Sequence, residues 1–246
     1  MPRDVQYAHD GTRMRGLLFS TPGVSGSPTI VLVHDAFGLN GHTLETAERY
    51  AALGFTVFAA DVWGDRLTPQ AESEIGPLIG GMVGDRARWI SRIAAAHEAA
   101  AAQPEVDASA LVTIGYCFGG SSALEYLRTG GRTRGVVSIH GGLDLLAPDW
   151  SGARTDARVL VCTGADDPMA TREQRAALET AMTGAGLDWE TDLYSDTKHA
   201  FTNPSSSHSP MPHVVAYNPR SAARAWESTT RLLGELFPEI KEKNHA

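Results

Sequence analysis

A cysteine lies in a glycine-rich turn near the middle of the chain. Cys117 stands in the hexapeptide Gly-Tyr-Cys-Phe-Gly-Gly at 115–120, with one glycine two residues before it and another two residues after it. An apolar, strand-like run at 111–114 precedes this turn, and a helix-like segment at 121–128 follows it. A sharp turn from strand to helix needs glycines, because side chains there would collide with the neighbouring strand and helix. The pattern predicts that Cys117 is a nucleophile held in strained backbone geometry.

A thiol nucleophile needs a general base, and the base needs a carboxylate that orients it. Two later strand-like runs end in such residues: 158–163 is followed by Asp166 and Asp167, and 189–194 is followed by His199. The carboxyl ends of the strands are where sites form in open α/β sheets, so we expect these side chains near Cys117. Nucleophile, acid and histidine follow one another in the order of the α/β-hydrolases. Spacing alone leaves either aspartate as the acid.

The elements that must position these side chains alternate between strand and helix. The pattern predicts strands at 5–8, 13–19, 29–34, 55–60, 111–114, 135–139, 158–163 and 189–194. It predicts helices at 42–53, 89–103, 121–128, 171–184 and 221–237, the fourth of which begins with a capping box. This alternation favours an α/β-hydrolase fold, a mostly parallel sheet with helices on both faces, in one domain over residues 1–246. The segment 202–217, rich in Ser, Pro and His, is expected to be a surface loop beside the site.

Composition and charge narrow the possible partners. A net charge of −8 argues against nucleic acid and against an anionic membrane surface. No apolar run approaches the roughly 18 residues of a membrane span, and the first residues lack the apolar core of a signal peptide. Two cysteines make no disulfide framework, and Cys162 sits in an apolar run where it should pack as a small apolar residue. We therefore expect a soluble cytoplasmic protein, monomeric or a small homo-oligomer, with a free thiol.

Taken together, the motifs resemble those of the dienelactone hydrolase family. The matching segments lie between about residues 29 and 203, at 34–40, 115–120, 138–142, 164–168 and 199–201. The resemblance implies an enzyme without a cofactor, similar to carboxymethylenebutenolidase, that hydrolyses a small ester or lactone through a thiol acyl-enzyme. It assigns Cys117 as the nucleophile, His199 as the general base and Asp167, which stands directly before a proline, as the triad acid. The backbone N–H groups of Ala36 and Phe118 are then expected to form the oxyanion hole.

The resemblance also suggests residues that handle the thiol proton and the substrate. Asp35 stands where the family carries an acidic residue, often glutamate, that takes the thiol proton, and its alternative role is to shape the loop. Asn203 stands where well-known members carry an arginine that holds the substrate carboxylate. Arg86, and beside it Arg88, could supply a cation instead. His140, at the end of a predicted strand, is expected beside the substrate, with a structural hydrogen-bonding role as the alternative.

Other functions compete with this one. A general carboxylesterase or thioesterase acting on another metabolite would use the same residues. A non-catalytic thiol protein, either a redox sensor or a ligand-binding relative, would need no ordered acid and histidine. The nine histidines include no His-Glu-x-x-His or paired-cysteine spacing, so we predict no metal site.

Overall fold

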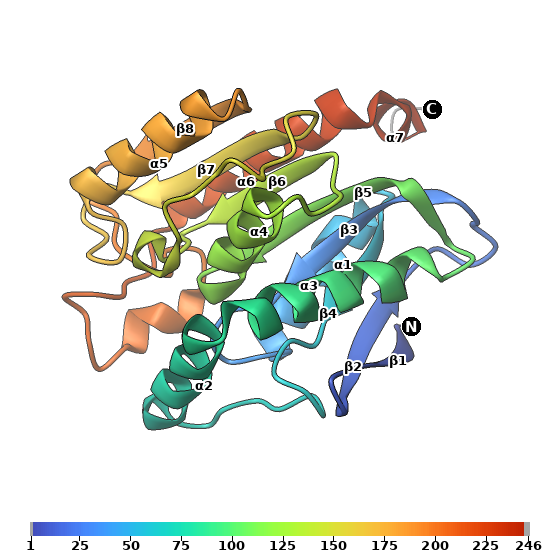
Figure 1. Ribbon diagram of the computed structural model, residues 1–246, viewed down its shortest axis with the longest axis horizontal. Helices are drawn as coiled ribbons and strands as arrows, with labels where there is room; N and C mark the ends of the chain where they lie inside the picture. Colours follow the sequence, from blue (N-terminus) through green and yellow to red (C-terminus); the bar gives the residue numbers. More distant parts are fainter. Residues whose placement is uncertain (1, 244–246) are drawn as a thin grey trace.

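The computed structural model describes residues 2–243, and its centre is an eight-stranded sheet (Figure 1). The strand order is β1-β2-β4-β3-β5-β6-β7-β8. The strands are β1 Arg3–His9, β2 Thr12–Phe19, β3 Ser27–Val33, β4 Thr56–Ala60, β5 Val106–Tyr116, β6 Gly135–Ile139, β7 Arg158–Gly164 and β8 Asp188–Tyr194. At one edge β1 pairs with β2, and β2 with β4, in antiparallel fashion, and the five other pairs of neighbouring strands are parallel. The predicted mostly parallel sheet is confirmed.

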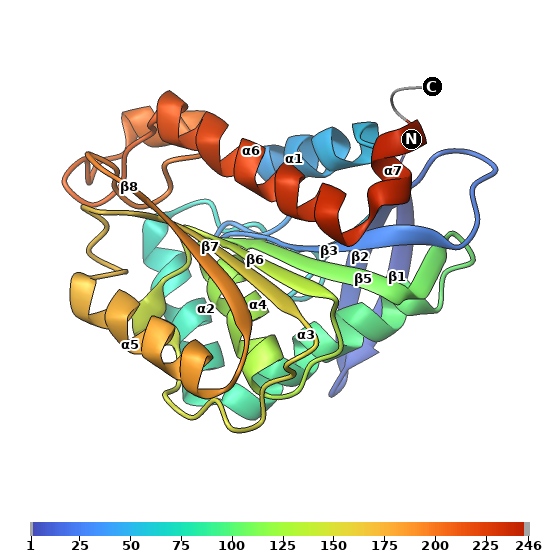
Figure 2. The same ribbon diagram turned by 90° about the horizontal axis from the view of Figure 1, so that it is seen from above.

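Helices cover both faces of this sheet, as Figure 2 shows from above. They are α1 Gly41–Ala52, α2 Glu72–Gly84, α3 Arg86–Ala101, α4 Phe118–Arg128, α5 Arg172–Gly184, α6 Pro219–Leu236 and α7 Pro238–Lys243. α1, α6 and α7 lie on one face, and α2 to α5 lie on the other. None of the helices in the described part of the chain is long and apolar enough to cross a membrane.

The most deeply buried parallel strands lie in the middle of the sheet. β4, β6 and nearly all of β3 are buried along their whole length, which a continuous apolar run permits only when helices cover both faces. On one face Tyr50 of α1 stacks on Trp226 of α6, with ring centroids 4.7 Å apart. On the other face Phe118 of α4 stacks between Trp63 and Trp89. Trp63 and Trp89 therefore belong to the core.

The main departure from the predicted elements is α2, which was not expected. Its sequence contains Pro77 and four glycines, residue types that disfavour a helix interior. Most of its residues are exposed or half-buried, and Met82 is its only buried residue. A smaller difference concerns α4, which begins at Phe118, three residues before the predicted segment at 121–128. Because Gly119 and Gly120 have low helix propensity, the sequence pattern does not predict that first helical turn.

Candidate active site

The carboxyl ends of five neighbouring strands meet along one edge of the sheet. Asp35 follows β3, Cys117 follows β5, His140 follows β6, Asp167 follows β7 and His199 follows β8. Parallel strands place these ends at a single rim, so residues far apart in the chain become neighbours.

Cys117 occupies the turn between β5 and α4 with a backbone φ of 54° and ψ of −120°. A non-glycine residue with positive φ costs on the order of 1–3 kcal/mol and must be held by its surroundings. Here the Cys117 N–H donates to the carbonyl of Ile139 at 3.0 Å and to Nδ1 of His140 at 3.1 Å. Strand β6 and the residue after it therefore hold the turn in its strained form.

The flanking glycines are required by close backbone contacts. A Cβ on Gly115 would lie 1.9 Å from the carbonyl oxygen of Gly119. A Cβ on Gly119 would lie 2.2 Å from the carbonyl oxygen of Val33. Both distances are far below van der Waals contact and both partners are backbone atoms, so neither position has room for a side chain.

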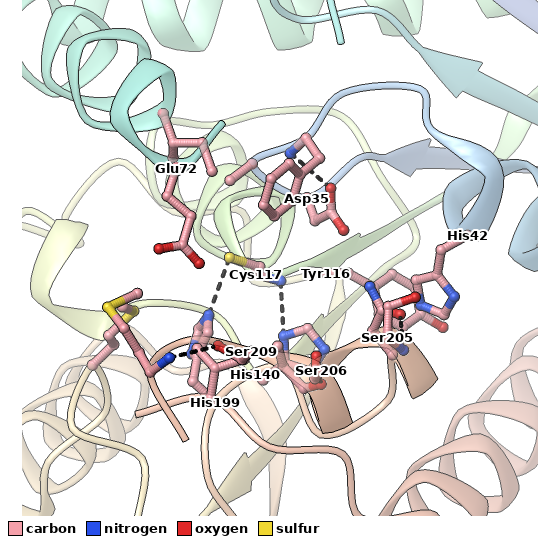
Figure 3. Close-up of a pocket in the computed structure, with 18 of the residues that line it drawn as sticks. Asp35, His42, Glu72, Tyr116, Cys117, His140, His199, Ser205, Ser206 and Ser209 are labelled. Carbon is pink, nitrogen blue, oxygen red and sulfur yellow. Dashed lines mark hydrogen bonds between the residues drawn. The ribbon is translucent and has the colours of Figure 1, made fainter. Parts of the chain in front are cut away.

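The thiol, an imidazole and a carboxylate form a chain of contacts, of which Figure 3 shows the one between the Cys117 sulfur and the His199 ring. Nε2 of His199 lies 3.1 Å from Sγ of Cys117, and Nδ1 of His199 lies 2.9 Å from Oδ2 of Asp167. The second Asp167 oxygen accepts the backbone N–H of Met169 at 2.8 Å. His199 and Asp167 are both 2% exposed, whereas Cys117 is half-buried. Asp166, the alternative acid, is exposed, and the carboxylate bonded to the imidazole Nδ1 is that of Asp167.

Charge in this cluster favours a protonated imidazole. Burial lowers the pKa of His199, but the negative sulfur of Cys117 and the hydrogen-bonded Asp167 carboxylate outweigh that effect. They raise its pKa to about 10. A protonated imidazole 3.1 Å from Sγ of Cys117 is placed to stabilise negative charge on the sulfur.

The predicted loop at 202–217 holds His199 in place. The His199 N–H donates to the carbonyl of Val214 at 3.1 Å, and the His199 carbonyl accepts the N–H of Ala216 at 3.2 Å. The loop contains a short 3-10 helix, Pro204–His208, capped by the side chain of Asn203. Its residues also line the cavity above the thiol, so the loop lies beside the site as expected.

A cavity of about 400 Å³ opens above the sulfur. Its walls come from the loop after β3, from α2, and from the 202–217 loop. The contribution of α2, namely Glu72, Ile75 and Ile79, was missed by sequence reasoning. Two isoleucines four residues apart, which is the spacing of one helical turn, were the available signal. The glycines and the proline of the segment argue against a helix, so the signal was missed.

Asp35 lines the cavity without touching the thiol. Its Oδ1 accepts the backbone N–H of Phe37 at 2.8 Å and the side-chain amide of Asn40 at 3.2 Å. Burial raises the pKa of this carboxyl. His34 steadies the same loop: its Nε2 accepts the N–H of Val62, so its Nδ1 carries the proton and donates to the Asp35 carbonyl. The carboxylate thus shapes the turn that presents Ala36, another cavity residue.

His140 is a neutral hydrogen-bonding residue beneath the thiol. Because Nδ1 accepts the Cys117 N–H, Nε2 carries the proton and donates to the hydroxyl of Thr202 at 2.8 Å. Burial, and then the neighbouring His199, lower its pKa well below the usual value. His140 also lines the cavity.

The two other expected substrate contacts lie in different places. Asn203 lines the cavity, where its side chain accepts the N–H of Ser205. Arg86 does not line the cavity, because its guanidinium pairs at 3.0 Å with the fully buried carboxylate of Glu125. Arg128 binds the same carboxylate at 2.7 Å. A buried carboxylate needs such partners, which explains why Arg86 is drawn away from the site.

Comparisons with known proteins agree with this geometry. The family model described as the dienelactone hydrolase family matches residues 14–237. The crystal structure of a dienelactone hydrolase-like promiscuous phosphotriesterase from metagenomic libraries superposes with a TM-score of 0.90, at 37% identity, over 96% of this chain and 98% of that chain. The crystal structure of dienelactone hydrolase from Anabaena variabilis shares the fold, with a TM-score of 0.64 at 20% identity over 97% and 98% of the two chains.

A protein related in sequence supports the same family assignment. A Synechocystis protein named "Putative carboxymethylenebutenolidase" is 24% identical over 245 residues, which is 93% of this chain and 94% of the relative. The eight-stranded sheet, the glycine-flanked turn between strand and helix, and the match over nearly the whole chain lead to one conclusion. The chain belongs to the dienelactone hydrolase family and is an α/β-hydrolase enzyme.

Proposed function

We propose that this enzyme hydrolyses small carboxylic esters or lactones with Cys117 as nucleophile, His199 as general base and acid, and Asp167 as the orienting carboxylate. The observation that carries the proposal is the unbroken line of contacts from sulfur to imidazole to carboxylate, 3.1 Å and 2.9 Å long, below a cavity. Such a line is the arrangement that activates a thiol. Membership of the dienelactone hydrolase family supports the same reaction class.

The first half of the reaction forms an acyl-enzyme. The Cys117 thiolate attacks the carbonyl carbon, and the carbonyl oxygen becomes an oxyanion. The backbone N–H groups of Phe118 and Ala36 are the proposed donors to this oxyanion, since neither donates to another group in the described protein. The first N–H also opens α4, whose positive end favours negative charge. The His199 imidazolium then protonates the leaving oxygen, and a thioester remains.

The second half releases the acid. Neutral His199 takes a proton from water through Nε2, and the resulting hydroxide attacks the thioester carbonyl. Collapse of the tetrahedral intermediate breaks the carbon–sulfur bond and restores the thiolate beside the imidazolium. Asp167 keeps Nδ1 protonated throughout, so Nε2 is the nitrogen that exchanges protons with sulfur, alcohol and water.

A comparison of the two cysteines tests the proposal. We expect wild type to hydrolyse 4-nitrophenyl acetate, 4-nitrophenyl butyrate or an unsaturated lactone, and Cys117→Ala to lose at least about 10³-fold in kcat/KM. Cys162→Ala, at a fully buried position in β7, is the matched control and should keep activity. Mass spectrometry of the quenched reaction should find one acyl group on the tryptic peptide with Cys117. Equal activity of wild type and Cys117→Ala on every hydrolysed substrate would refute the assignment.

Phosphotriester hydrolysis is a second candidate, favoured by one observation. The relative that superposes at 37% identity is described as a promiscuous phosphotriesterase. A thiolate can attack phosphorus, and the same N–H donors would stabilise the phosphoryl oxygen. Diethyl 4-nitrophenyl phosphate distinguishes the outcomes, because turnover releases many equivalents of nitrophenol. A single equivalent followed by inactivation would leave only the ester function.

A further inference from the structure

Apart from the proposed catalytic pair, Cys117 and His199, the charged groups that line the cavity are acidic. The acidic residues that line it are Asp35 and Glu72, and among its described lining residues no lysine or arginine occurs. The other titratable lining groups are Tyr116, the proposed catalytic pair, and three histidines at positions 42, 140 and 208. Burial lowers the pKa of His42 and of His140, so these two rings are neutral at pH 7.

Three basic side chains that could have served the site bind other groups of the protein instead. Arg86 is held by the buried Glu125, as described above. Arg88 donates to the carbonyl of Gly81 on the outer part of α2. Lys198, although it precedes His199, donates to the carbonyl of Pro212 at 2.6 Å. Apart from the imidazolium of His199, which the proposed reaction uses, no described residue that lines the cavity offers a positive charge to a substrate carboxylate.

Glu72 brings its negative charge to the mouth of the cavity. It lies in the first turn of α2 and is exposed to solvent. Figure 3 shows its carboxylate turned toward the space beside the Cys117 sulfur. The loop after β3 contributes Asp35 to the same cavity. A substrate that enters meets both acidic side chains, of which Asp35 has a pKa that burial raises.

The apolar residues in the other walls strengthen the Coulomb interaction between these acidic side chains and a charged substrate. Ile75 and Ile79 of α2 and Met211 and Val215 of the 202–217 loop line the cavity with apolar surface. Apolar walls exclude water, and Coulomb interactions grow as the local dielectric constant falls. A carboxylate on the substrate would lose hydration and face like charges, whereas an ammonium group would be attracted.

We propose, as an extension of the function proposed above, that the cavity selects esters whose acyl group carries a positive charge or none, and that Glu72 determines this selectivity. Esters with a cationic acyl group are the preferred class, uncharged esters follow, and carboxylate-bearing esters or lactones are the poorest substrates. This order of substrate preference is the opposite of that expected for an enzyme whose site binds a substrate carboxylate.

Esters of matched shape test the order. The three acyl groups are glutarate, its uncharged isostere 5-methylhexanoate, and 4-(trimethylammonio)butanoate, each as the 4-nitrophenyl ester. After subtraction of the uncatalysed rates, we expect kcat/KM for the glutarate ester to lie about tenfold below that of the isostere. The cationic ester should lie above the isostere. A glutarate ester hydrolysed as fast as the isostere would overturn the proposal.

Two variants on one helical turn isolate the role of Glu72. If Glu72 and Asp35 contribute equally, Glu72→Gln halves the logarithm of the tenfold discrimination and leaves about threefold. Glu74→Gln removes the same charge from the same turn, but Glu74 does not line the cavity. It should keep the tenfold ratio. Equal ratios in Glu72→Gln and wild type, or equal effects of the two variants, would contradict a local role for Glu72.

Charged thiol reagents separate this proposal from the catalytic one. Cationic and anionic methanethiosulfonates, trimethylammonioethyl and sulfonatoethyl, modify Cys117 whether or not the protein turns over esters. With each rate constant normalised to that for 2-mercaptoethanol, we expect the cationic reagent to react at least about tenfold faster than the anionic one. Glu72→Gln should lower this ratio and Glu74→Gln should not. A ratio near one refutes the charge selectivity, while absence of ester turnover alongside a high ratio refutes only the catalytic assignment.

Discussion

The contact between Asp167 and His199 supports a substitution whose effect can be worked out in detail. In Asp167→Asn the side chain keeps its shape and loses its charge. Asp167 now accepts two N–H groups, from the imidazole Nδ1 at 2.9 Å and from the Met169 backbone at 2.8 Å. An amide has one oxygen and one nitrogen, so it can satisfy only one of these donors.

Both orientations of the asparagine impair the site. With the amide nitrogen toward His199, Nδ1 must become the acceptor, and the proton moves to Nε2, which can then no longer take a proton. With the amide oxygen toward His199, the amide nitrogen faces the N–H of Met169 and leaves a buried donor unsatisfied. A lost charge-assisted hydrogen bond costs about 1.5–3 kcal/mol, and an unsatisfied buried group costs about 1–3 kcal/mol.

A loss of about 3–4 kcal/mol of transition-state stabilisation corresponds to about 150–1,000-fold in kcat/KM. The assay is hydrolysis of 4-nitrophenyl acetate, with thermal unfolding as a check that each variant is folded. Asp166→Asn is the matched control, since Asp166 is exposed and adjacent, and we expect it to stay within about twofold of wild type. A folded Asp167→Asn within tenfold of wild type, or a larger loss in Asp166→Asn, would refute the reasoning.

Three further predictions concern the charge on His199, the space at Gly115 and the buried carboxylate of Glu125. Cys117→Ala removes the negative sulfur, so the His199 ring, whose pKa is about 10, should titrate at a lower pH when followed by NMR. Because the folded pKa lies above the ordinary 6.5, the stability contributed by the imidazolium is full below about pH 6.5 and is lost as the pH rises toward 10. An unshifted ring titration would disprove the coupling. Gly115→Ala puts a Cβ 1.9 Å from a backbone carbonyl of α4 and should destabilise the fold by about 3 kcal/mol or more, measured by urea unfolding. Gly76→Ala, where a Cβ meets nothing within 4 Å, is its control and should not destabilise. Glu125→Ala leaves two arginines without their buried partner and should cost about 3–5 kcal/mol in the same assay, whereas a loss below about 1 kcal/mol would show that the ion pair is dispensable.

The central parallel strands could be predicted from local patterns because they are apolar along most of their length. The runs that became β3, β4, β6 and β7 are short, continuous and bounded by turn residues, which is the pattern of strands buried on both faces. The long amphipathic pattern at 221–237 likewise predicts α6, since an apolar stripe is a local property. Helix α2 could not be predicted in this way. Its glycines and Pro77 have low helix propensity, so a local pattern does not predict a helix. Its tertiary contacts beside the cavity override this propensity.

For the site, residue types and chain order by themselves determined that a thiol turn, an acid and a histidine follow successive strands. This information is local, because each residue is recognised by the strand end before it. The partner of each side chain was decided only by the tertiary structure: Asp167 and not Asp166 reaches the imidazole, and Arg86 turns to Glu125. Neighbouring aspartates in one turn point in different directions, and a long arginine side chain goes where a buried charge requires it. The tertiary structure also decided which acidic residues line the cavity, since Asp35 and Glu72 come together only after β3 and α2 have packed around the thiol.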